Sequence, residues 1–194
     1  MVVFDLETTG LMQDPEAFPT VGVSHDVHAG QYGMWDRKDL KGLASYLKGA
    51  DIVSGFNILR FDLPFLERET GISLDGVAVL DPFQHILKHT GRFVGLDKVL
   101  GALWPNNPEM RKSDSGADAI GMYRRGEIER LRSYCALDVY LETAVALEAV
   151  MNGLMVGDKT LPPMTEDDIQ VYKTSLKPIA MPTAVVSKSF TTIH

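Results

Sequence analysis

The sequence has little cysteine, no long apolar segment and no excess of basic residues. Cys135 is the only cysteine in 194 residues, which excludes an internal disulfide or a zinc site built from several cysteines. The chain does not start with a basic stretch followed by an apolar one, and no uncharged apolar run reaches the roughly 18 residues of a transmembrane helix. We therefore expect no membrane segment, no export signal and a reducing, cytoplasmic location.

The charge balance is acidic. Lys and Arg total 19 against 26 Asp and Glu, so the formal net charge is -7. This argues against a protein that coats nucleic acid, because nonspecific affinity comes from neutralising phosphates. A nuclease is not excluded, because some carboxylates could be metal ligands. Phosphate-binding loops of the Gly-x-Gly-x-x-Gly or P-loop type do not occur.

The spacing of apolar residues predicts an α/β domain with a mixed sheet, an antiparallel meander followed by parallel strands. We expect strands over 1–5, 20–28, 31–35, 51–55 and 77–80. We expect helices over 38–48, 62–69, 84–88, 96–104, 117–125 and 127–151. The domain should span 1–151, and 152–194 should be an extension of unknown role. Within it, 165–172 is predicted as a short helix capped by Thr165, and 184–193 as a strand or a tail.

Asp5 and Glu7 are the first carboxylates that are hard to explain as surface residues. A two-residue spacing on a strand puts both side chains on one face, about 7 Å apart along the chain. One divalent cation could be held by both. The segment Asp14-Pro15-Glu16 repeats the spacing in a polar loop, whereas Asp5 ends an apolar run. Ligands gather at strand ends in α/β sheets, so a metal site and an acidic turn are both open interpretations.

Tyr134 and Asp138 are four residues apart on a predicted helix, which brings the phenol and the carboxylate to one side. Asp138 falls in an apolar arc of that helix, together with Cys135 and Glu142. A carboxylate buried there needs a cation or hydrogen-bond donors. The alternative is a helix edge bordered by water. Cys135 itself is expected to fill the core.

Asn57 and Asp62 follow the predicted strand that closes near Gly55. Asp62 lies at the start of a predicted helix, with Pro64 in its first turn. It could therefore be a functional acid or a plain N-cap, which is worth about 1 kcal/mol.

Taken in order, these pieces resemble the DEDD (DnaQ-like) 3′-5′ exonucleases of the ribonuclease H-like fold. The match is an acidic strand motif, then Asn-x-x-x-Phe-Asp, then Tyr-x-x-x-Asp on a late helix, and it spans residues 1 to about 151. The segment from Lys112-Ser113-Asp114-Ser115-Gly116 to Tyr134-Cys135-Ala136-Leu137-Asp138-Val139 resembles the YprB-like group in particular. The histidine branch carries His five residues before the last Asp. No His lies between His89 and His194, so the resemblance is to the tyrosine branch.

The resemblance implies a site with two Mg²⁺ or Mn²⁺ ions. The implied ligands are Asp5, Glu7, Asp62 and Asp138. Asp5 would bridge the ions, Asp62 would serve the second partly through water, and Tyr134 would orient the attacking water. The residues implied to contact the terminal nucleotide are Thr8, Leu11, Asn57 and Phe61. Leu11 and Phe61 could equally be core residues. Carboxylates suit these ions, and two of them about 3.5 to 4 Å apart can activate water and stabilise a leaving oxygen.

The expected activity is metal-dependent 3′-5′ exonuclease action on single-stranded or frayed 3′ ends, releasing nucleoside monophosphates. The two-metal chemistry does not distinguish DNA from RNA. An endonuclease of the same fold and a silent nuclease domain kept as a binding module are the alternatives. Only four residues precede Asp5, so the chain could be the catalytic piece of a larger assembly, or need a partner to hold its substrate.

Two further patterns carry less weight. His85 and His89 are spaced for one helix face, but no Glu follows His85 and no third ligand is evident, so a zinc site is not expected. Residues 88–132 hold nine Lys or Arg against six Asp or Glu. The candidates for phosphate contacts are Arg111, Lys112, Arg124 and Arg125, with a solvated helical surface as the alternative.

Overall fold

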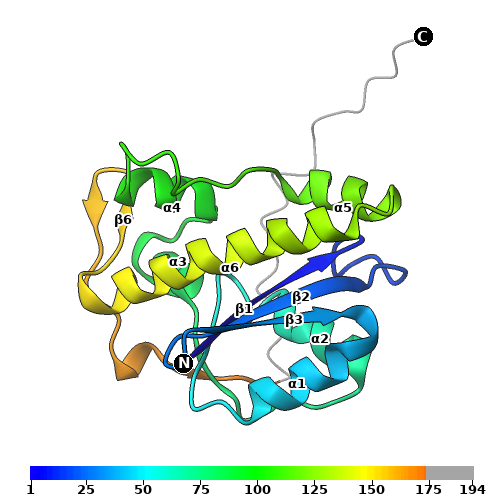
Figure 1. The fold of residues 1–194 in the computed structure, drawn as a ribbon. Helices are drawn as coiled ribbons and strands as arrows, with labels where there is room; N and C mark the ends of the chain where they lie inside the picture. The colour runs from blue at the N-terminus through cyan, green and yellow to red at the C-terminus, as the bar shows by residue number, and fades with distance from the viewer. Residues whose placement is uncertain (174–194) are drawn as a thin grey trace.

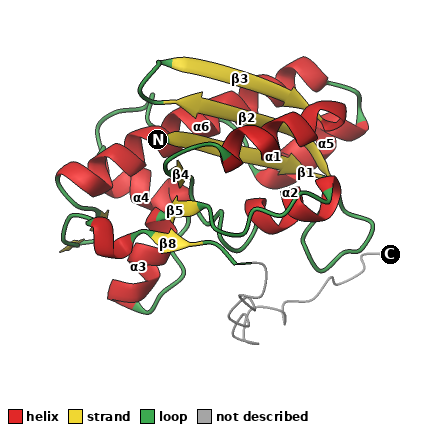
Figure 2. Cartoon of the chain, turned by 90° about the horizontal axis from the view of Figure 1, so that it is seen from below, coloured by secondary structure: helices red, strands yellow, loops and turns green. Residues whose placement is uncertain are grey.

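The computed structural model describes residues 1–173, which form a six-stranded sheet with helices on both faces (Figure 1). The strand order is β3-β2-β1-β4-β5-β8, as Figure 2 shows from below. The strands are β1 (Val2–Thr8), β2 (Pro19–Asp26), β3 (Gln31–Asp36), β4 (Val53–Ser54), β5 (Ala78–Leu80) and β8 (Gln170–Val171). A small hairpin of β6 (Met155–Val156) and β7 (Lys159–Thr160) stands apart from this sheet.

The pairing confirms the predicted mixed sheet. The first three strands form an antiparallel meander, β4 and β5 continue from β1 in parallel, and β8 closes the edge antiparallel to β5. The central strand β1 pairs with β2 along its whole length but with β4 only through Val2 and Val3. One edge of β1 is therefore open to other groups from Phe4 onward.

Six α-helices cover the sheet. They are α1 (Leu40–Lys48), α2 (Asp62–Thr70), α3 (Pro82–Thr90), α4 (Leu96–Leu103), α5 (Gly116–Arg124) and α6 (Ile128–Met151) among the residues described. In Figure 1 the meander strands run between α6 on one side and α1 and α2 on the other. Single 3₁₀ turns occur at Arg37–Asp39 (η1) and Glu166–Asp168 (η2). Over residues 1–173, none of these helices has the length and apolar character needed to cross a membrane.

The alternation of side chains along β1 divides the core into two layers. Phe4 and Leu6 point toward α1 and α2, where they pack with residues such as Leu43 and Leu63. Val3 points the other way and joins the layer under α5 and α6. Side chains two residues apart on a strand share a face. Asp5 and Glu7 therefore project from the Val3 side of the sheet, toward α6.

The chain beyond α6 packs onto the same domain as far as residue 173. Leu161 and Met164 are buried against the helices, and the buried Tyr172 donates its hydroxyl to Glu67 Oε2 at 2.9 Å. The helix predicted over 165–172 is wrong, because only η2 forms before β8. A short helix has little stability of its own, whereas the open edge of β5 offers backbone groups for pairing. The segment 184–193 lies outside the described residues, and the division at residue 151 stays a prediction.

Candidate active site

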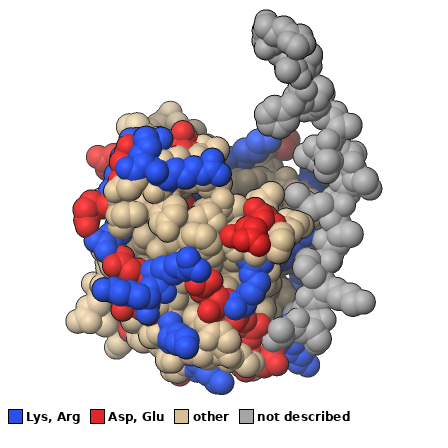
Figure 3. All heavy atoms as spheres, turned by 90° about the vertical axis from the view of Figure 1, so that its right-hand side faces the viewer, with Lys and Arg blue, Asp and Glu red and all other residues tan. Residues whose placement is uncertain are grey.

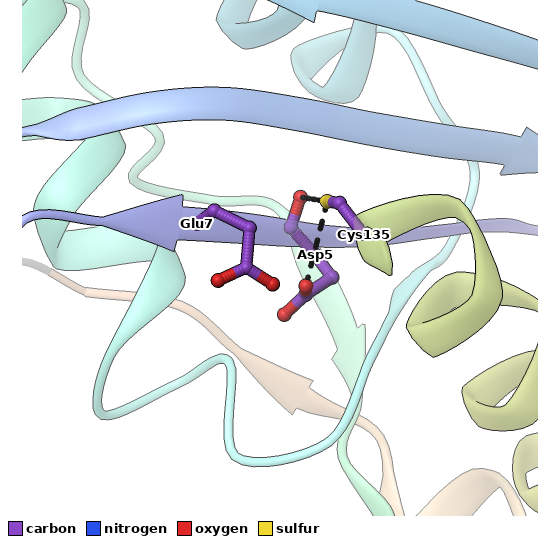
Figure 4. Close-up of side chains that lie close together, drawn as sticks. All are labelled: Asp5, Glu7 and Cys135. Carbon is purple, nitrogen blue, oxygen red and sulfur yellow. Dashed lines mark hydrogen bonds between the residues drawn. The ribbon is translucent and has the colours of Figure 1, made fainter. Parts of the chain in front are cut away.

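Strand β1 carries the first two acids, on the face that the two-residue spacing predicted. The strand does not end at Asp5 as expected, because Glu7 still pairs with Val21 of β2. Both carboxylates lie side by side below the strand in Figure 4, with the Cys135 side chain of α6 next to Asp5. One ligand atom from each of these three residues lies within 4.8 Å of the other two.

Asp62 reaches the same strand from the start of α2. Its Oδ1 accepts a hydrogen bond from the backbone N–H of Leu6 at 3.2 Å, on the edge that β4 leaves open. The N-cap position of α2 is Phe61, and no side chain caps this helix. The interpretation of Asp62 as a plain N-cap is therefore wrong. The buried Asp62 carboxylate accepts the hydrogen bond of a β1 backbone N–H that β4 does not reach.

Helix α6 supplies Tyr134, Asp138 and Glu142, all of which are buried. The Oδ1 atom of Asp138 is buried without a hydrogen-bond partner. Glu142 Oε2 accepts from the backbone N–H of Phe56 at 3.2 Å, which places this acid behind the loop between β4 and α2. The alternative prediction, a helix edge bordered by water, is therefore wrong for this side of α6. Glu142 faces the acidic site, because the charges of Asp5, Asp62 and Asp138 all act on it.

Lys112 enters the acidic site from the segment between α4 and α5. Its Nζ lies 2.6 Å from Asp138 Oδ2 and 5.3 Å from the centre of the Tyr134 ring. Its side chain is only 22% exposed. The neighbouring Arg111 instead donates to backbone carbonyls of its own region, at 2.6 Å to Met110 and 2.9 Å to Trp104. Lys112 is therefore the basic residue of this pair that could reach a bound substrate.

Burial and mutual repulsion raise the pKa values of the acids. Burial and the charge of Asp138 raise the pKa of Asp5 to about 6, and burial and the charge of Asp5 raise the pKa of Glu7 to about 9. Burial also raises the pKa values of Asp62, Asp138 and Glu142. Burial acts to lower the pKa of Lys112, but Asp138 outweighs it and the pKa is raised. One ammonium therefore does not compensate the carboxylates, and further cations would be stabilised here.

Cys135 is buried, as expected of a core residue, but it also contacts the site. Its Sγ lies 3.5 Å from Asp5 Oδ2 and 3.6 Å from the backbone oxygen of Asp5. Burial and the charge of Asp5 raise the pKa of the thiol, so it stays protonated and acts as a hydrogen-bond donor. Helical spacing had indicated only that Cys135 and Asp138 share an arc of the helix.

A pocket of about 290 Å³ is lined by Leu11, Asn57 and Phe61 together with Arg60 and Phe93. None of the five acids lines it, but its Phe61 directly precedes Asp62 in the chain. Leu11 is 66% exposed and is not a core residue, whereas Phe61 lines the pocket and packs against the core. Thr8 is not part of this lining. It is buried, and its hydroxyl donates to Gly10 O at 2.7 Å.

Asp81 organises this pocket and was not identified from the sequence. Its buried carboxylate caps α3 through Phe83 N at 3.0 Å and accepts from Asn57 N at 2.9 Å and Leu59 N at 3.2 Å. Asn57 has a positive φ of 73°, which these bonds help to hold. The Asp-Pro pair before α3 signals an N-cap. The bonds to the other loop join residues distant in sequence and have no local signal.

The family comparison agrees with this architecture. The profile of a family described as the RNase H superfamily matches residues 2–145, which include β1, the start of α2 and most of α6. The chain belongs to the RNase H superfamily. A search of curated proteins finds no match. Membership of the RNase H superfamily implies a nucleic-acid substrate in general, suggests a nuclease, and is typical of proteins that use divalent metals.

Proposed function

We propose that the chain is a metal-dependent 3′-5′ exonuclease that removes nucleotides from single-stranded or frayed 3′ ends. The observation that carries the proposal is the convergence of carboxylates from three elements on one site. These acids are Asp5 and Glu7 from β1, Asp62 from α2, and Asp138 with Glu142 from α6. Burial raises the pKa of each of these five acids, and mutual repulsion adds to it, so cations bound among them would be stabilised.

The donor set fits Mg²⁺ or Mn²⁺. All the acids offer hard oxygen ligands, and Asp138 Oδ1 is buried with no hydrogen-bond partner. Asp5 is suited to be a shared ligand, because its charge raises the pKa of Glu7, Asp62 and Glu142. When two such ions are bound, they supply an activated water and stabilise the leaving 3′ oxygen.

Tyr134 and Lys112 complete the proposed chemistry. Burial and Asp138 raise the pKa of Tyr134, so its phenol keeps its proton and would orient a water or a phosphate oxygen by hydrogen bonding. It would not act as the base. The Lys112 ammonium holds Asp138 in place and lies where it could contact a phosphate oxygen of the substrate.

The pocket lined by Asn57 and Phe61 favours action at a chain end. It is a bounded space of about 290 Å³, of the size of a small ligand site, with an aromatic and aliphatic lining that a base could stack on. Asn57 and Phe61 belong to the segment that leads into Asp62, so a nucleotide held there would lie next to the metal ligands. Thr8 does not line the pocket, and it is proposed to contact the terminal nucleotide only because it lies at the end of β1, directly after Glu7.

The test uses a single strand labelled at its 3′-terminal nucleotide, in the presence of Mn²⁺. We expect wild type to release labelled mononucleotides, and Asp5→Ala and Asp138→Ala to reduce release to background. Glu16→Gln is the matched control, because Glu16 is an exposed acid of the second Asp-x-Glu sequence. Unchanged activity in both site variants would refute the proposal.

Two further measurements separate the alternatives. A circular or 3′-blocked strand should resist the enzyme, and its cleavage would favour an endonuclease of the same fold. Calorimetric titration of wild type with Mn²⁺ should show binding that Asp5→Ala weakens. Absence of Mn²⁺ binding would favour a silent domain that only binds nucleic acid or protein.

A further inference from the structure

A second cluster of metal-ligating side chains lies where α3 meets the chain after α6. It borders a cavity of about 360 Å³ whose lining includes His85, Lys88 and Asp168. The His85 side chain is only 1% exposed. Its Nε2 lies 2.9 Å from the backbone oxygen of Pro162. A carbonyl oxygen only accepts hydrogen bonds, so Nε2 carries a proton and donates it.

The other ring nitrogen of His85, Nδ1, is buried beside a carboxylate without a hydrogen bond. It lies 3.5 Å from Asp168 Oδ1. In the neutral ring with Nε2 protonated, Nδ1 presents a lone pair. Two electron-pair donors then face each other, so a proton or a cation between them is needed to make the contact favourable. Lys88 Nζ also reaches Asp168 Oδ1, at 2.8 Å, but from a side chain that is 62% exposed.

His89 adds a third ligand group one helical turn after His85. The two imidazole rings have their centres 4.4 Å apart. Burial lowers the pKa of His89, which favours the neutral, ligating form of its ring. Two histidines and one carboxylate are a zinc ligand set, and imidazole selects transition metals over Mg²⁺. A backbone carbonyl that fixes the far nitrogen, as Pro162 does for His85, is the usual support of a ligating histidine.

We propose that His85, His89 and Asp168 form a second metal site, for Zn²⁺ or a similar transition metal, which fastens η2 to α3. Asp168 lies outside the matched residues 2–145, so the site does not follow from family membership. Among residues 1–173, only the Asp5, Glu7 and Cys135 set already has three ligand atoms within 4.8 Å of one another. The His89 ring would therefore turn on binding, which its partly exposed position allows.

The experiment isolates this site from the acidic one. The parent protein is the Asp5→Asn/Asp138→Asn double variant, freed of metal by a chelator and titrated with Zn²⁺ in a calorimeter. We expect one Zn²⁺ per chain and a rise in Tm on binding. Adding His89→Ala or Asp168→Asn should weaken binding by at least about tenfold, because even the loss of an outer-shell partner of a metal ligand costs about 10- to 100-fold in affinity. His28→Ala is the control, because His28 is exposed and outside the cluster.

The Lys88→Met variant distinguishes a metal site from a purely structural contact between His85 and Asp168. Removing the ammonium next to Asp168 should weaken the metal-free contact but increase Zn²⁺ affinity severalfold, because a competing cation is gone. All these substitutions leave the buried His85 and its hydrogen bond to Pro162 in place. The proposal is overturned if no Zn²⁺ binds, or if His89→Ala and Asp168→Asn bind it as tightly as the parent. A Tm that depends on pH but not on Zn²⁺ would assign a proton, not a metal, to His85 Nδ1.

Discussion

Replacing Glu7 by Gln should make the metal-free protein more stable at pH 8, although Glu7 is a proposed metal ligand. Burial and Asp5 raise the pKa of Glu7 from 4.5 to about 9 in the folded chain. A carboxyl with a higher pKa folded than unfolded binds more protons in the folded state, so stability falls as pH rises from the lower to the higher value. Gln removes this penalty, because it carries no charge in either state.

The size of the effect follows from the pKa values. One proton held over the interval from pH 4.5 to pH 8 corresponds to at most about 5 kcal/mol, at about 1.4 kcal/mol for each pH unit. The excess protons are shared with Asp5 and Asp62, and Lys112 offsets part of the repulsion. We therefore expect Glu7→Gln to stabilise by about 1 to 3 kcal/mol, or roughly 3 to 10 °C in Tm for a domain of this size.

Thermal unfolding in EDTA at pH 5 and pH 8 tests this. The wild-type Tm should fall between the two conditions, and the Glu7→Gln Tm should fall less and exceed it at pH 8. Saturating Mn²⁺ should reverse the order, because the ion stabilises the folded state only as far as it binds. Glu16→Gln should leave both Tm values unchanged. A Glu7→Gln variant less stable than wild type in EDTA at pH 8 would show that repulsion among the acids does not govern this site.

Three other substitutions probe the supports of the site. Gly55→Ala should destabilise by about 1 to 3 kcal/mol in urea, because the added Cβ would overlap Ile58 Cγ2 and lie 2.6 Å from the backbone oxygen of Phe4; wild-type stability would mean that the loop yields. Asp81→Ala should lower the free energy of unfolding by about 2 to 5 kcal/mol, because it leaves three backbone N–H groups without their acceptor. A loss of stability under about 1 kcal/mol would contradict this. Lys112→Met should lower the Tm in EDTA at pH 8, opposite to Glu7→Gln, because Asp138 loses its counter-charge; an unchanged Tm would indicate that water replaces the ammonium.

Most of the fold could be predicted because its signals are local. The alternation along β1 and the helical spacing of α6 depend on near neighbours in the sequence, and both appear as expected. The failures concern elements whose ends depend on distant partners. β1 extends to Thr8 because β2 pairs with it, and 165–172 becomes a turn and a strand because β5 has an open edge.

The acidic site was predictable in its members but not in its contacts. Spacing placed Asp5 with Glu7 and Tyr134 near Asp138, and the resemblance to the DEDD exonucleases linked these pairs to Asp62. Nothing local could show that Asp62 would bond to Leu6, because this depends on how early β4 stops pairing. The pairing of Lys112 with Asp138, and of His85 with Asp168, likewise requires segments far apart in sequence to fold side by side.

The acidity of the chain takes on a different meaning once the acids are located. Figure 3 shows basic and acidic side chains interspersed on one face of the molecule, without a continuous basic surface for a nucleic-acid backbone. The formal charge of -7 includes five carboxylates at the proposed metal site, and two divalent ions would bring the total to -7 + 4 = -3. Attraction for phosphates would then arise mainly at the metals and Lys112. Substrate binding should therefore depend on metal and on a free end, rather than on contacts along a duplex.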